Sequence, residues 1–600
     1  MKGTKALYIR LQELGTNFAY TVKLMWGVSK YHMFGVAVTI LMSATLPAIG
    51  LYIGKLAIDV IASSRSVERL GFITTYIFWG LVVAVAVAFF RSVSVYLQKR
   101  FSDIFSLSIN RMIFEKAEEL DITYFENATF HNDLKRVTEQ VTYKPVNLLR
   151  GSCQIVAGGV TLMTFIFVLI QFQPLVAVLL LVSGVLAFVS ESRMAFYEFI
   201  RLDYQVPVVR RMNMLYWMAT SVQNAKEGRI YGTGAHFKRE YLHLLDTYNQ
   251  TAASVASGRV WSTTLVAAGS AIIYSGVYLY LIWQALSGNL SIGDLVLFSG
   301  IYLQASGILA QIGWEAGEIL QSSMFVEVLK RFMAYMPPKT GTRKALETLQ
   351  LGLELRNVSF TYAGSERPVV VDINLKIHPG ETIAVVGDNG AGKSTLVKLL
   401  CRLYDPTVGS AMYDGIDMRD YDRFSLYSCY GILFQDYVHY MSTARENIAY
   451  GDLASLDDFN HIQAMAKLSG ADAFVRTLPK QYETPLTRSI DDGVDLSGGQ
   501  WQMLSLARAL MRRAPIVILD EPTSALSPTA ESEVFEMLRN NLTEQQIGIF
   551  VSHRFSTIRQ ARRIIVMDQG RITEMGSHED LIALHGQYAR MYTIQAEAFK

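Results

Sequence analysis

The most informative stretch of this chain is the nine residues Gly387-Asp388-Asn389-Gly390-Ala391-Gly392-Lys393-Ser394-Thr395. They match the phosphate-binding pattern G-x-x-x-x-G-K-[ST], between an apolar run at 382–386 and a helical pattern at 396–403. Glycines let successive N–H groups face phosphate oxygens, and the following helix begins with its positive dipole end toward the anion. Lys393 would meet the β- and γ-phosphates, and the Ser394 hydroxyl would bind Mg²⁺. The stretch therefore predicts binding of ATP or GTP.

The composition indicates a membrane protein of more than one domain. A chain of 600 residues is too long for a single core. It is 51% hydrophobic, and the apolar excess lies before about residue 325. The 55 basic and 53 acidic side chains nearly cancel, so no nucleic-acid partner is expected. Cys153, Cys401 and Cys429 are too widely spaced to suggest a disulfide scaffold or a zinc site.

Six apolar stretches each approach the roughly 20 residues that a bilayer core requires. Membrane spans are predicted at about 34–58, 72–93, 148–172, 174–196, 260–286 and 292–319. The third and fourth are separated only by Gln173, which predicts a tight hairpin. The segments 91–150 and 193–259 are long and basic, whereas the turn at 287–290 is short and uncharged. This alternation places both chain ends in the cytosol by the positive-inside rule.

The segments outside the spans keep a helical pattern. Residues 16–33 mix aromatic and basic side chains, which indicates either a helix at the cytosolic membrane surface or the first turns of the first span. The two long basic segments are predicted to be membrane helices that continue into the cytosol. A short crossing element is expected near 124–135 in one of them and near 224–234 in the other.

The predicted fold is therefore multidomain. Residues 1–335 form an α-helical transmembrane domain of six helices, and the proline- and charge-rich segment 336–350 is a linker. Residues 351–600 alternate strand and helix patterns around the phosphate loop, which predicts an α/β P-loop NTPase domain.

Two further strands of this domain end in polar residues. The apolar run 516–519 delivers Asp520 and Glu521, which fits a carboxylate that holds Mg²⁺ followed by one that accepts a proton from the attacking water. The strand 547–551 leads to His553, a candidate for contact with the γ-phosphate.

A second candidate anion site lies at the start of another helix. Leu496 is followed by Ser497, Gly498, Gly499 and Gln500, and then by a helical pattern. A serine and two glycines at a helix start form a second anion-binding terminus. Since one nucleotide does not need two such termini from one domain, one of them is expected to serve the ATP of a neighbouring subunit.

With this ordered set of motifs, the sequence resembles the ATP-binding cassette (ABC) transporter family over essentially its whole length. One cassette after six spans looks like a half-transporter of the type IV, exporter-like fold, with ATP and Mg²⁺ as cofactors. The resemblance implies that Tyr362 stacks on adenine and that Gln435 senses Mg²⁺ and contacts the membrane domain. It also implies that Ser497 closes on the partner's γ-phosphate and that His553 stabilises the transition state. The crossing elements would be coupling helices, one of them docking on the partner. Ser527 stands where the family usually has aspartate.

The sixth span carries a polar stripe. It consists of Gln304, Gln311, Glu315, Glu318 and Ser322, which fall within roughly a 60° arc of a helix. Polar groups at membrane depth normally face a bundle interior or a water-filled path. The stripe would then line a cargo cavity whose glutamates favour a cationic or amphipathic cargo. Alternatively, the helix has left the bilayer by Glu315, and the carboxylates are ordinary cytosolic charges.

These features predict an ATP-driven exporter in the cell membrane that works as a dimer, most simply a homodimer. The phrase G-V-D-L-S-G-G-Q-W-Q resembles bacterial peptide or antibiotic exporters, so an amphipathic small molecule or peptide is the expected cargo. The alternatives are a lipid flippase of the same architecture and an importer with the exporter fold. A soluble ATPase clamp is disfavoured by the six spans.

Overall fold

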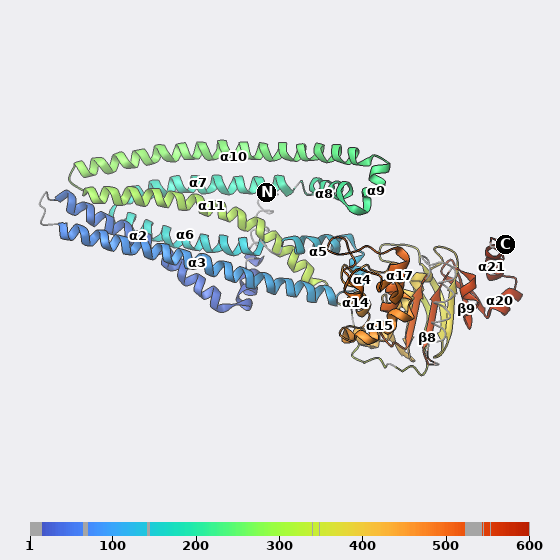
Figure 1. Ribbon diagram of the computed structural model, residues 1–600. Helices are drawn as coiled ribbons and strands as arrows, with labels where there is room; N and C mark the ends of the chain where they lie inside the picture. The colour runs from blue at the N-terminus through green and yellow to red at the C-terminus, as the bar shows by residue number, and fades with distance from the viewer. Residues whose placement is uncertain are drawn as a thin grey trace. The chain divides into compact units, whose positions relative to one another are not determined.

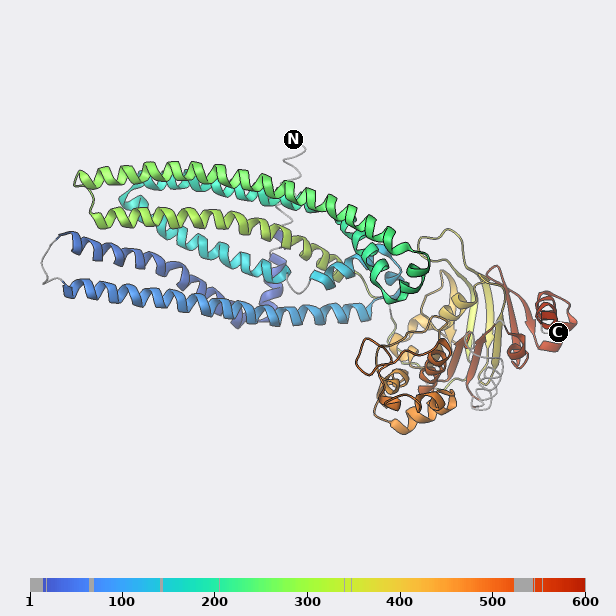
Figure 2. The same cartoon turned by 45° about the horizontal axis from the view of Figure 1, so that its top comes forward.

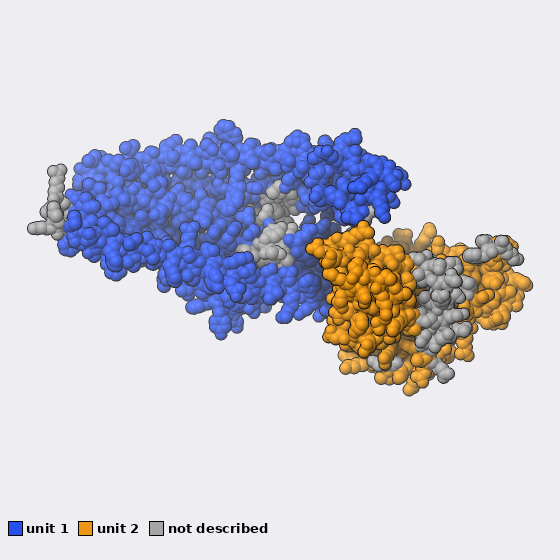
Figure 3. Space-filling view, viewed as in Figure 1, with its two compact units in different colours: residues 1–119, 128–336 blue, residues 120–127, 337–600 orange. Residues whose placement is uncertain are grey.

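The chain divides into two compact units. The structure, a computed structural model, describes residues 15–17, 19–63, 70–140, 144–203, 205–338, 340–346, 348–522, 543, 545–552 and 554–598. The first unit comprises Met1–Glu119 with Ala128–Met336, and the second comprises Leu120–Asn127 with Pro337–Lys600 (Figure 3). This grouping departs from the predicted division, which left residues 120–127 in the membrane domain.

The first unit is entirely helical in the described residues. Long helices lie side by side along one axis in both ribbon views (Figures 1 and 2). The helices are α2 (Lys30–Ser63), α3 (Leu70–Glu119), α5 (Ala128–Gln140), α6 (Lys144–Phe172), α7 (Pro174–Asp203), α8 (Val206–Thr220), α9 (Val222–Ile230), α10 (Thr233–Leu286) and α11 (Ile292–Ala334).

Within the described residues, six helices are long and apolar enough to cross a bilayer. They contain the six predicted spans, and only Gln173 separates α6 from α7, as predicted. The 50 residues of α3 and the 54 residues of α10 confirm that two membrane helices continue unbroken beyond their apolar segments. The short helix α9 is the crossing element expected near 224–234.

Helix α11 packs closely on α7 because two residues of α11 at the contact are glycines, which have no side chain. A Cβ on Gly317 would lie 2.2 Å from Ala195 Cβ, and one on Gly313 would lie 3.1 Å from the Phe188 carbonyl oxygen. Arg259 of α10 adds two ion pairs to α7, with Glu191 at 3.0 Å and with Glu198 at 2.9 Å. The Arg259 guanidinium also lies 3.9 Å from the ring centroid of Trp314 on α11. Helices α7, α10 and α11 are thereby joined.

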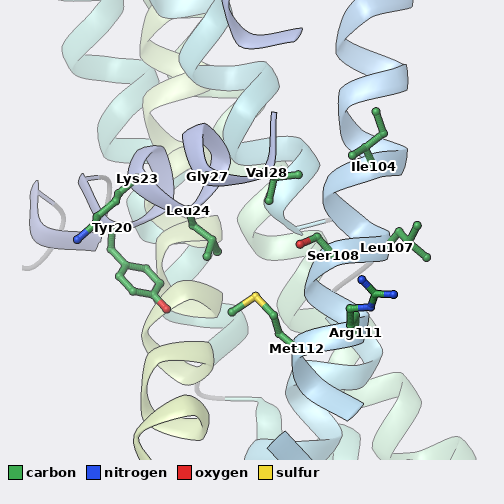
Figure 4. Close-up of a pocket in the computed structure, with 10 residues that line it drawn as sticks. All are labelled: Tyr20, Lys23, Leu24, Gly27, Val28, Ile104, Leu107, Ser108, Arg111 and Met112. Atoms are coloured by element: carbon green, nitrogen blue, oxygen red, sulfur yellow. The ribbon is translucent and has the colours of Figure 1, made fainter. Parts of the chain in front are cut away.

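Residues 19–28 form a separate helix, since Ser29 interrupts the helical backbone before α2. Just before this helix, Asn17 donates to Ser323 Oγ at 3.3 Å and accepts from Lys330 Nζ at 3.1 Å, which tethers it to α11. A hollow of about 690 Å³ lies between this helix and α3. Tyr20, Leu24 and Met112 point into it (Figure 4).

The second unit is built on two sheets. Its strands are β1 (Leu353–Phe360), β2 (Val370–Ile377), β3 (Thr382–Val386), β4 (Val408–Tyr413), β5 (Ile416–Asp417), β6 (Tyr430–Leu433), β7 (Ile516–Asp520), β8 (Ile547–Val551), β9 (Arg563–Asp568) and β10 (Arg571–Gly576). The smaller sheet has the order β2-β1-β4-β5, with antiparallel pairs. The larger has the order β10-β9-β3-β8-β7-β6, and all but the outer β10 run parallel.

Helices cover the larger sheet and connect its strands. They are α12 (Lys393–Leu400), α13 (Arg423–Tyr427), α14 (Ala444–Ala449), α15 (Phe459–Leu468), α16 (Ala471–Val475), α17 (Gly498–Met511), α19 (Phe555–Ile558), α20 (His578–Ala583) and α21 (Gln587–Ala598). The central strands are buried on both faces, because continuous apolar runs such as Ile516–Leu519 have helices on either side.

The second unit also holds the short helix α4 (Ile122–Phe125). Arg423 pairs with Asp121 at 2.5 Å, and the Tyr404 hydroxyl donates to Glu126. The crossing element predicted near 124–135 is therefore shorter and earlier than expected, because residues after 127 belong to α5 of the first unit.

Residues of the predicted linker pack on the second unit as well. The Gly341 amide donates to the Arg419 carbonyl oxygen at 2.9 Å, and the Ala345 amide donates to Ser425 Oγ at 2.8 Å.

We predict that Gly317→Ala destabilises the first unit, whereas Gly307→Ala on the same helix does not. The added methyl at 317 overlaps Ala195, while no atom lies within 4 Å of the Gly307 position. Overpacking of this kind costs about 1–3 kcal/mol. Thermal unfolding of the detergent-solubilised full-length protein measures the difference. Equal melting temperatures for the two variants would contradict the close α7–α11 contact.

Candidate functional site

The phosphate loop connects buried strand β3 to helix α12, and its glycines are required by the backbone. Gly387 has a φ of 151°, and a Cβ there would lie 2.2 Å from the Met567 carbonyl oxygen. Gly392 has a φ of 98°, and a Cβ there would lie 2.9 Å from the Val369 carbonyl oxygen. A side chain at either position would force the loop open. Its amides and the start of α12 are thus directed at the space that an anion fills.

Lys393 is buried inside this loop. Its Nζ donates to the carbonyl oxygens of Gly387 at 2.7 Å and Asp388 at 3.0 Å. Burial lowers the pKa of the Lys393 ammonium, and the nearby carboxylates of Glu521 and Asp520 act against this shift. The loop therefore holds a positive charge beside its backbone amides, which suits a polyphosphate.

Asp520, at the end of β7, is buried next to Lys393. Its Oδ1 is buried without a hydrogen-bond partner in the part of the chain that the structure describes, and the Ser394 hydroxyl bonds its carboxylate. Burial raises the pKa of Asp520 to about 6. A buried carboxylate with an unpaired oxygen beside a hydroxyl fits a hard cation such as Mg²⁺, which prefers oxygen ligands. Ser394 and Asp520 are the side chains that would hold it.

Glu521 follows in a left-handed backbone conformation, with a φ of 50°. The Glu521 amide donates to the Val551 carbonyl oxygen at 2.9 Å, and Gln502 Nε2 donates to the Glu521 carbonyl oxygen at 3.0 Å. These bonds hold the backbone in a conformation that non-glycine residues rarely adopt. Gln435, just after β6, donates to Glu521 Oε2 at 3.0 Å. Two predicted residues that lie 86 positions apart are thus brought together by the parallel neighbours β6 and β7.

Ser497 begins helix α17, as the motif predicted. It forms a capping box with Gln500, in which the Gln500 amide donates to Ser497 Oγ and the Ser497 amide donates to Gln500 Oε1 at 2.9 Å. Gly498 and Gly499 form the first turn. Among the described residues, no hydrogen bond joins this helix start to the phosphate loop of the same chain, and the amides of Gly498 and Gly499 take no part in the capping box.

Helix α17 is tied to the segment that follows Gln435. Trp501 stacks on His439 with ring centroids 4.3 Å apart, and the Tyr437 hydroxyl donates to the Gly498 carbonyl oxygen at 3.2 Å. Arg508 donates to the carbonyl oxygens of Asn447 and Val438. Sequence reasoning missed Gln502, His439 and Arg508. For these three residues, the one signal in the sequence was Arg508, a charged residue on the apolar face of the helical pattern 501–510.

Tyr362 lies at the edge of the phosphate loop. Its hydroxyl is 3.1 Å from Thr395 Oγ1, and its ring packs edge-on against Phe360 and Tyr404. His553 and Ser527 lie outside the described residues.

The predicted cargo stripe does not form one continuous exposed surface. Gln304 and Gln311 are exposed, and Gln311 Nε2 donates to Gln154 Oε1 on α6 at 3.2 Å. Glu315 and Ser322 are buried, and Glu318 is half-buried. The reason is that α11 packs on α6, where Gly151 leaves room for the Glu315 carboxylate. The acidic half of the stripe therefore faces α6.

The two units together define a multi-pass membrane protein with a nucleotide-binding cassette. Residues 33–309 match the ABC transporter transmembrane region, and residues 370–524 match the ABC transporter family. The lipid A-core flippase of Aromatoleum aromaticum is 31% identical, over 81% of this chain and 80% of that protein. The chain belongs to the ABC transporter family, and it is an ATPase coupled to transport.

Further similarities agree with this family. The chain is 28% identical to the subtilin transport ATP-binding protein SpaT of Bacillus subtilis, over 92% of this chain and 89% of the relative. It is 28% identical to the nisin transport ATP-binding protein NisT of Lactococcus lactis, over 95% of each. The solved structure of a bacterial Atm1-family ABC exporter with ATP bound has a TM-score of 0.78, with 24% identity over 95% of this chain and 99% of that one. The exporter fold is thereby shown.

We predict that Asp520→Asn stabilises the protein when nucleotide and Mg²⁺ are absent. Because the pKa of Asp520 is raised from 3.8 to about 6, its ionisation disfavours the folded state as pH rises through this interval. Removing the charge should add about 1–3 kcal/mol at pH 7.5, and the gain should shrink as pH falls to about 5. Thermal unfolding in a chelator at both pH values measures it.

The control is Asp388→Asn, an exposed carboxylate of the phosphate loop, for which we expect little change at either pH. A pH-independent effect of Asp520→Asn would show that burial of the charge is not its cause.

Proposed function

We propose that this transporter exports an amphipathic small molecule or peptide, driven by ATP hydrolysis between the cassettes of a homodimer. The observation that carries the proposal is the convergence of Lys393, Asp520, Glu521 and Gln435 at one edge of the larger sheet. Charged and hydrogen-bonding groups suited to a nucleotide lie beside a carboxylate that could accept a proton. The described residues of the same chain also include six helices long and apolar enough to cross a membrane.

Each site residue receives a role in this proposal. Tyr362 stacks on the adenine ring, and the loop from Gly387 to Thr395 holds the phosphates. When bound to Ser394, Asp520 and Gln435, Mg²⁺ would neutralise phosphate charge. Glu521 accepts the proton of the attacking water. His553 contacts the γ-phosphate.

The start of α17 is proposed to act on the ATP of the partner subunit. Gly498 and Gly499 present amides at a helix start that Ser497 and Gln500 cap, which suits a phosphate group. If each ATP needs the loop of one subunit and the helix start of the other, ATP favours the closed dimer. A ligand shifts a conformational equilibrium only through such a difference in affinity.

The short crossing helices would transmit this closure to the spans. Helix α4 is already held on the second unit by Arg423 and Tyr404. Helix α9 instead leaves Val222, Ile230 and Tyr231 exposed, at 89%, 79% and 73% of their maximum. Because three exposed apolar side chains on so short a segment are unusual in water, we propose that α9 docks on the partner's cassette.

The cargo assignment rests on relatives. SpaT and NisT are named for transport of subtilin and nisin, and they align with most of this chain. The lipid A-core flippase supports the alternative of lipid flipping. Both termini and the ATPase unit are proposed to be cytoplasmic, because the long segments are basic.

Transport assays separate these candidates. Export predicts ATP-dependent uptake of cargo into inverted vesicles, import predicts uptake only into right-side-out vesicles, and flipping predicts movement of a labelled lipid without any peptide. A protein that moves nothing in any of the three assays would refute the proposal.

We expect Glu521→Gln to lower ATP turnover by about 10²-fold or more while ATP still binds, since only the proton acceptor is lost. Lys393→Ala should abolish ATP binding as well. Phosphate release and nucleotide binding by the full-length protein in lipid measure the two effects. Glu579→Gln, an exposed change on α20, serves as the control and should retain full turnover.

We expect Ile230→Asp to uncouple ATP turnover from transport, because a carboxylate on the exposed tip of α9 opposes docking on an apolar surface. Basal turnover should persist, while cargo movement falls by about tenfold, as about 1.4 kcal/mol of lost docking would produce. Ile230→Val is the matched control. Undiminished transport by Ile230→Asp would argue against a coupling role for α9.

A further inference from the structure

The last turns of α2 lie against the first turns of α11, as both ribbon views show (Figures 1 and 2). Gly293 in the first turn of α11 approaches α2 so closely that a Cβ there would lie 2.5 Å from the Lys55 carbonyl oxygen. Further along α11, a Cβ on Gly300 would lie 3.3 Å from Leu51 Cδ2. Because residue numbers rise along α11 as they fall along α2, the two helices run antiparallel in direct contact.

Two polar contacts join these helix ends. Lys55 Nζ pairs with Asp294 Oδ1 at 2.6 Å, and Asp59 Oδ1 accepts a hydrogen bond from the Gly293 amide at 2.9 Å. The side chains of Lys55 and Asp294 are 21% and 19% exposed, so water can reach both charges. The other oxygen of Asp294 accepts from Ser291 in the capping box that begins α11. Asp294 thus serves both the start of its own helix and the contact with α2.

Further toward the cytosolic ends of their spans, the same two helices line a pocket. It has a volume of about 570 Å³ and includes Ala44 of α2 and Ile308 of α11, together with residues of α3 and α6. Ala44 is 15 residues from Asp59, and Ile308 is 15 residues from Gly293, which is about 22 Å of helix in each case. With both termini cytosolic, as proposed above, the contact between α2 and α11 therefore closes this pocket on its outer side.

The contact also joins two groups of helices. Helix α2 packs along α3, where a Cβ on Gly50 would lie 3.6 Å from a methyl group of Val83. Helix α11 belongs to the group that Arg259 holds together with α7 and α10. Polar contacts at a partly exposed boundary suit a contact that opens and closes, because water replaces each lost partner when the helices part.

We propose that Lys55, Asp59 and Asp294 form an outer latch, which holds α2 on α11 and opens when the cassettes close on ATP. In the closed state the latch seals the outer end of the pocket. In the open state water hydrates the separated charges. This inference rests on the proposed function, because an exporter must keep its outer end closed while cargo enters and open it for release. Gly293 contributes by leaving room for the latch residues to meet.

Carbodiimide cross-linking of the full-length protein in lipid nanodiscs tests the outer latch. The reagent condenses a lysine amine with a carboxylate that touches it, with loss of water, so it reports on Lys55 and Asp294 directly. The internal reference is the pair Lys99–Asp103, which lies at 3.0 Å within α3. When the Glu521→Gln protein is loaded with ATP and Mg²⁺, we expect the ratio of latch to reference cross-links to fall by about tenfold or more. Peptide mass spectrometry measures this ratio.

Variants at Lys55 provide a second measurement. A cysteine in place of Leu51 is introduced with the native cysteines replaced by serine, and its reaction with a water-soluble maleimide is followed without nucleotide. Lys55→Met keeps the length of the side chain and removes its charge, so we expect the reaction to become about tenfold faster as the open state gains population. Lys55→Arg should react like the parent protein. The matched control is Lys99→Met, which breaks an ion pair on α3 and should also leave the rate unchanged.

An unchanged cross-link ratio in a sample that has bound ATP would overturn the outer latch. Equal cysteine reactivity in Lys55→Met and in its parent would do the same. Bound nucleotide is measured on the same samples. A Glu521→Gln protein that binds no ATP would contradict the proposed nucleotide site instead, and the cysteine measurement, which needs no nucleotide, would then decide the latch.

Discussion

The buried Asp520 carboxylate beside Lys393 is the interaction on which the rest of this structure depends. A strand buried on both faces delivers Asp520 into a site where burial raises its pKa to about 6 and leaves one oxygen unpaired. Such a group is stable only if something positive completes its surroundings. Lys393 does so in part, and a nucleotide with its metal ion would complete the rest. The buried Asp520 carboxylate thus lowers the folding stability of the cassette when no ligand is bound, and it supplies an oxygen that a metal ion can bind.

The same site is connected to helix α17. Gln502 fixes the Glu521 backbone from within α17, and Arg508 and Trp501 hold the segment after Gln435 against that helix. If a partner subunit displaced α17, the positions of Glu521 and Gln435 would therefore change together. Packed elements of this kind move as units rather than deform continuously. In the proposed dimer, this linkage would connect nucleotide binding to the movement of α17.

The membrane unit combines close helix packing with a cavity. Gly313 and Gly317 let α7 and α11 come into close contact, and Arg259 of α10 forms ion pairs with α7. Helices α7, α10 and α11 are therefore held together. A pocket of about 570 Å³ lies between α2, α3, α6 and α11.

The sequence alone determined the six spans, the phosphate loop, the carboxylates after β7 and the serine cap of α17, because each follows from local periodicity or from the spacing of a few residues. Only the tertiary structure decided which distant residues meet: Gln435 with Glu521, Arg508 with Asn447, and Gly151 with Glu315. The polar stripe shows the reason. Helical spacing places Gln311 and Glu315 on one face, but whether a residue on that face meets a cavity or a neighbouring helix depends on side chains more than 150 positions away, which no local pattern encodes.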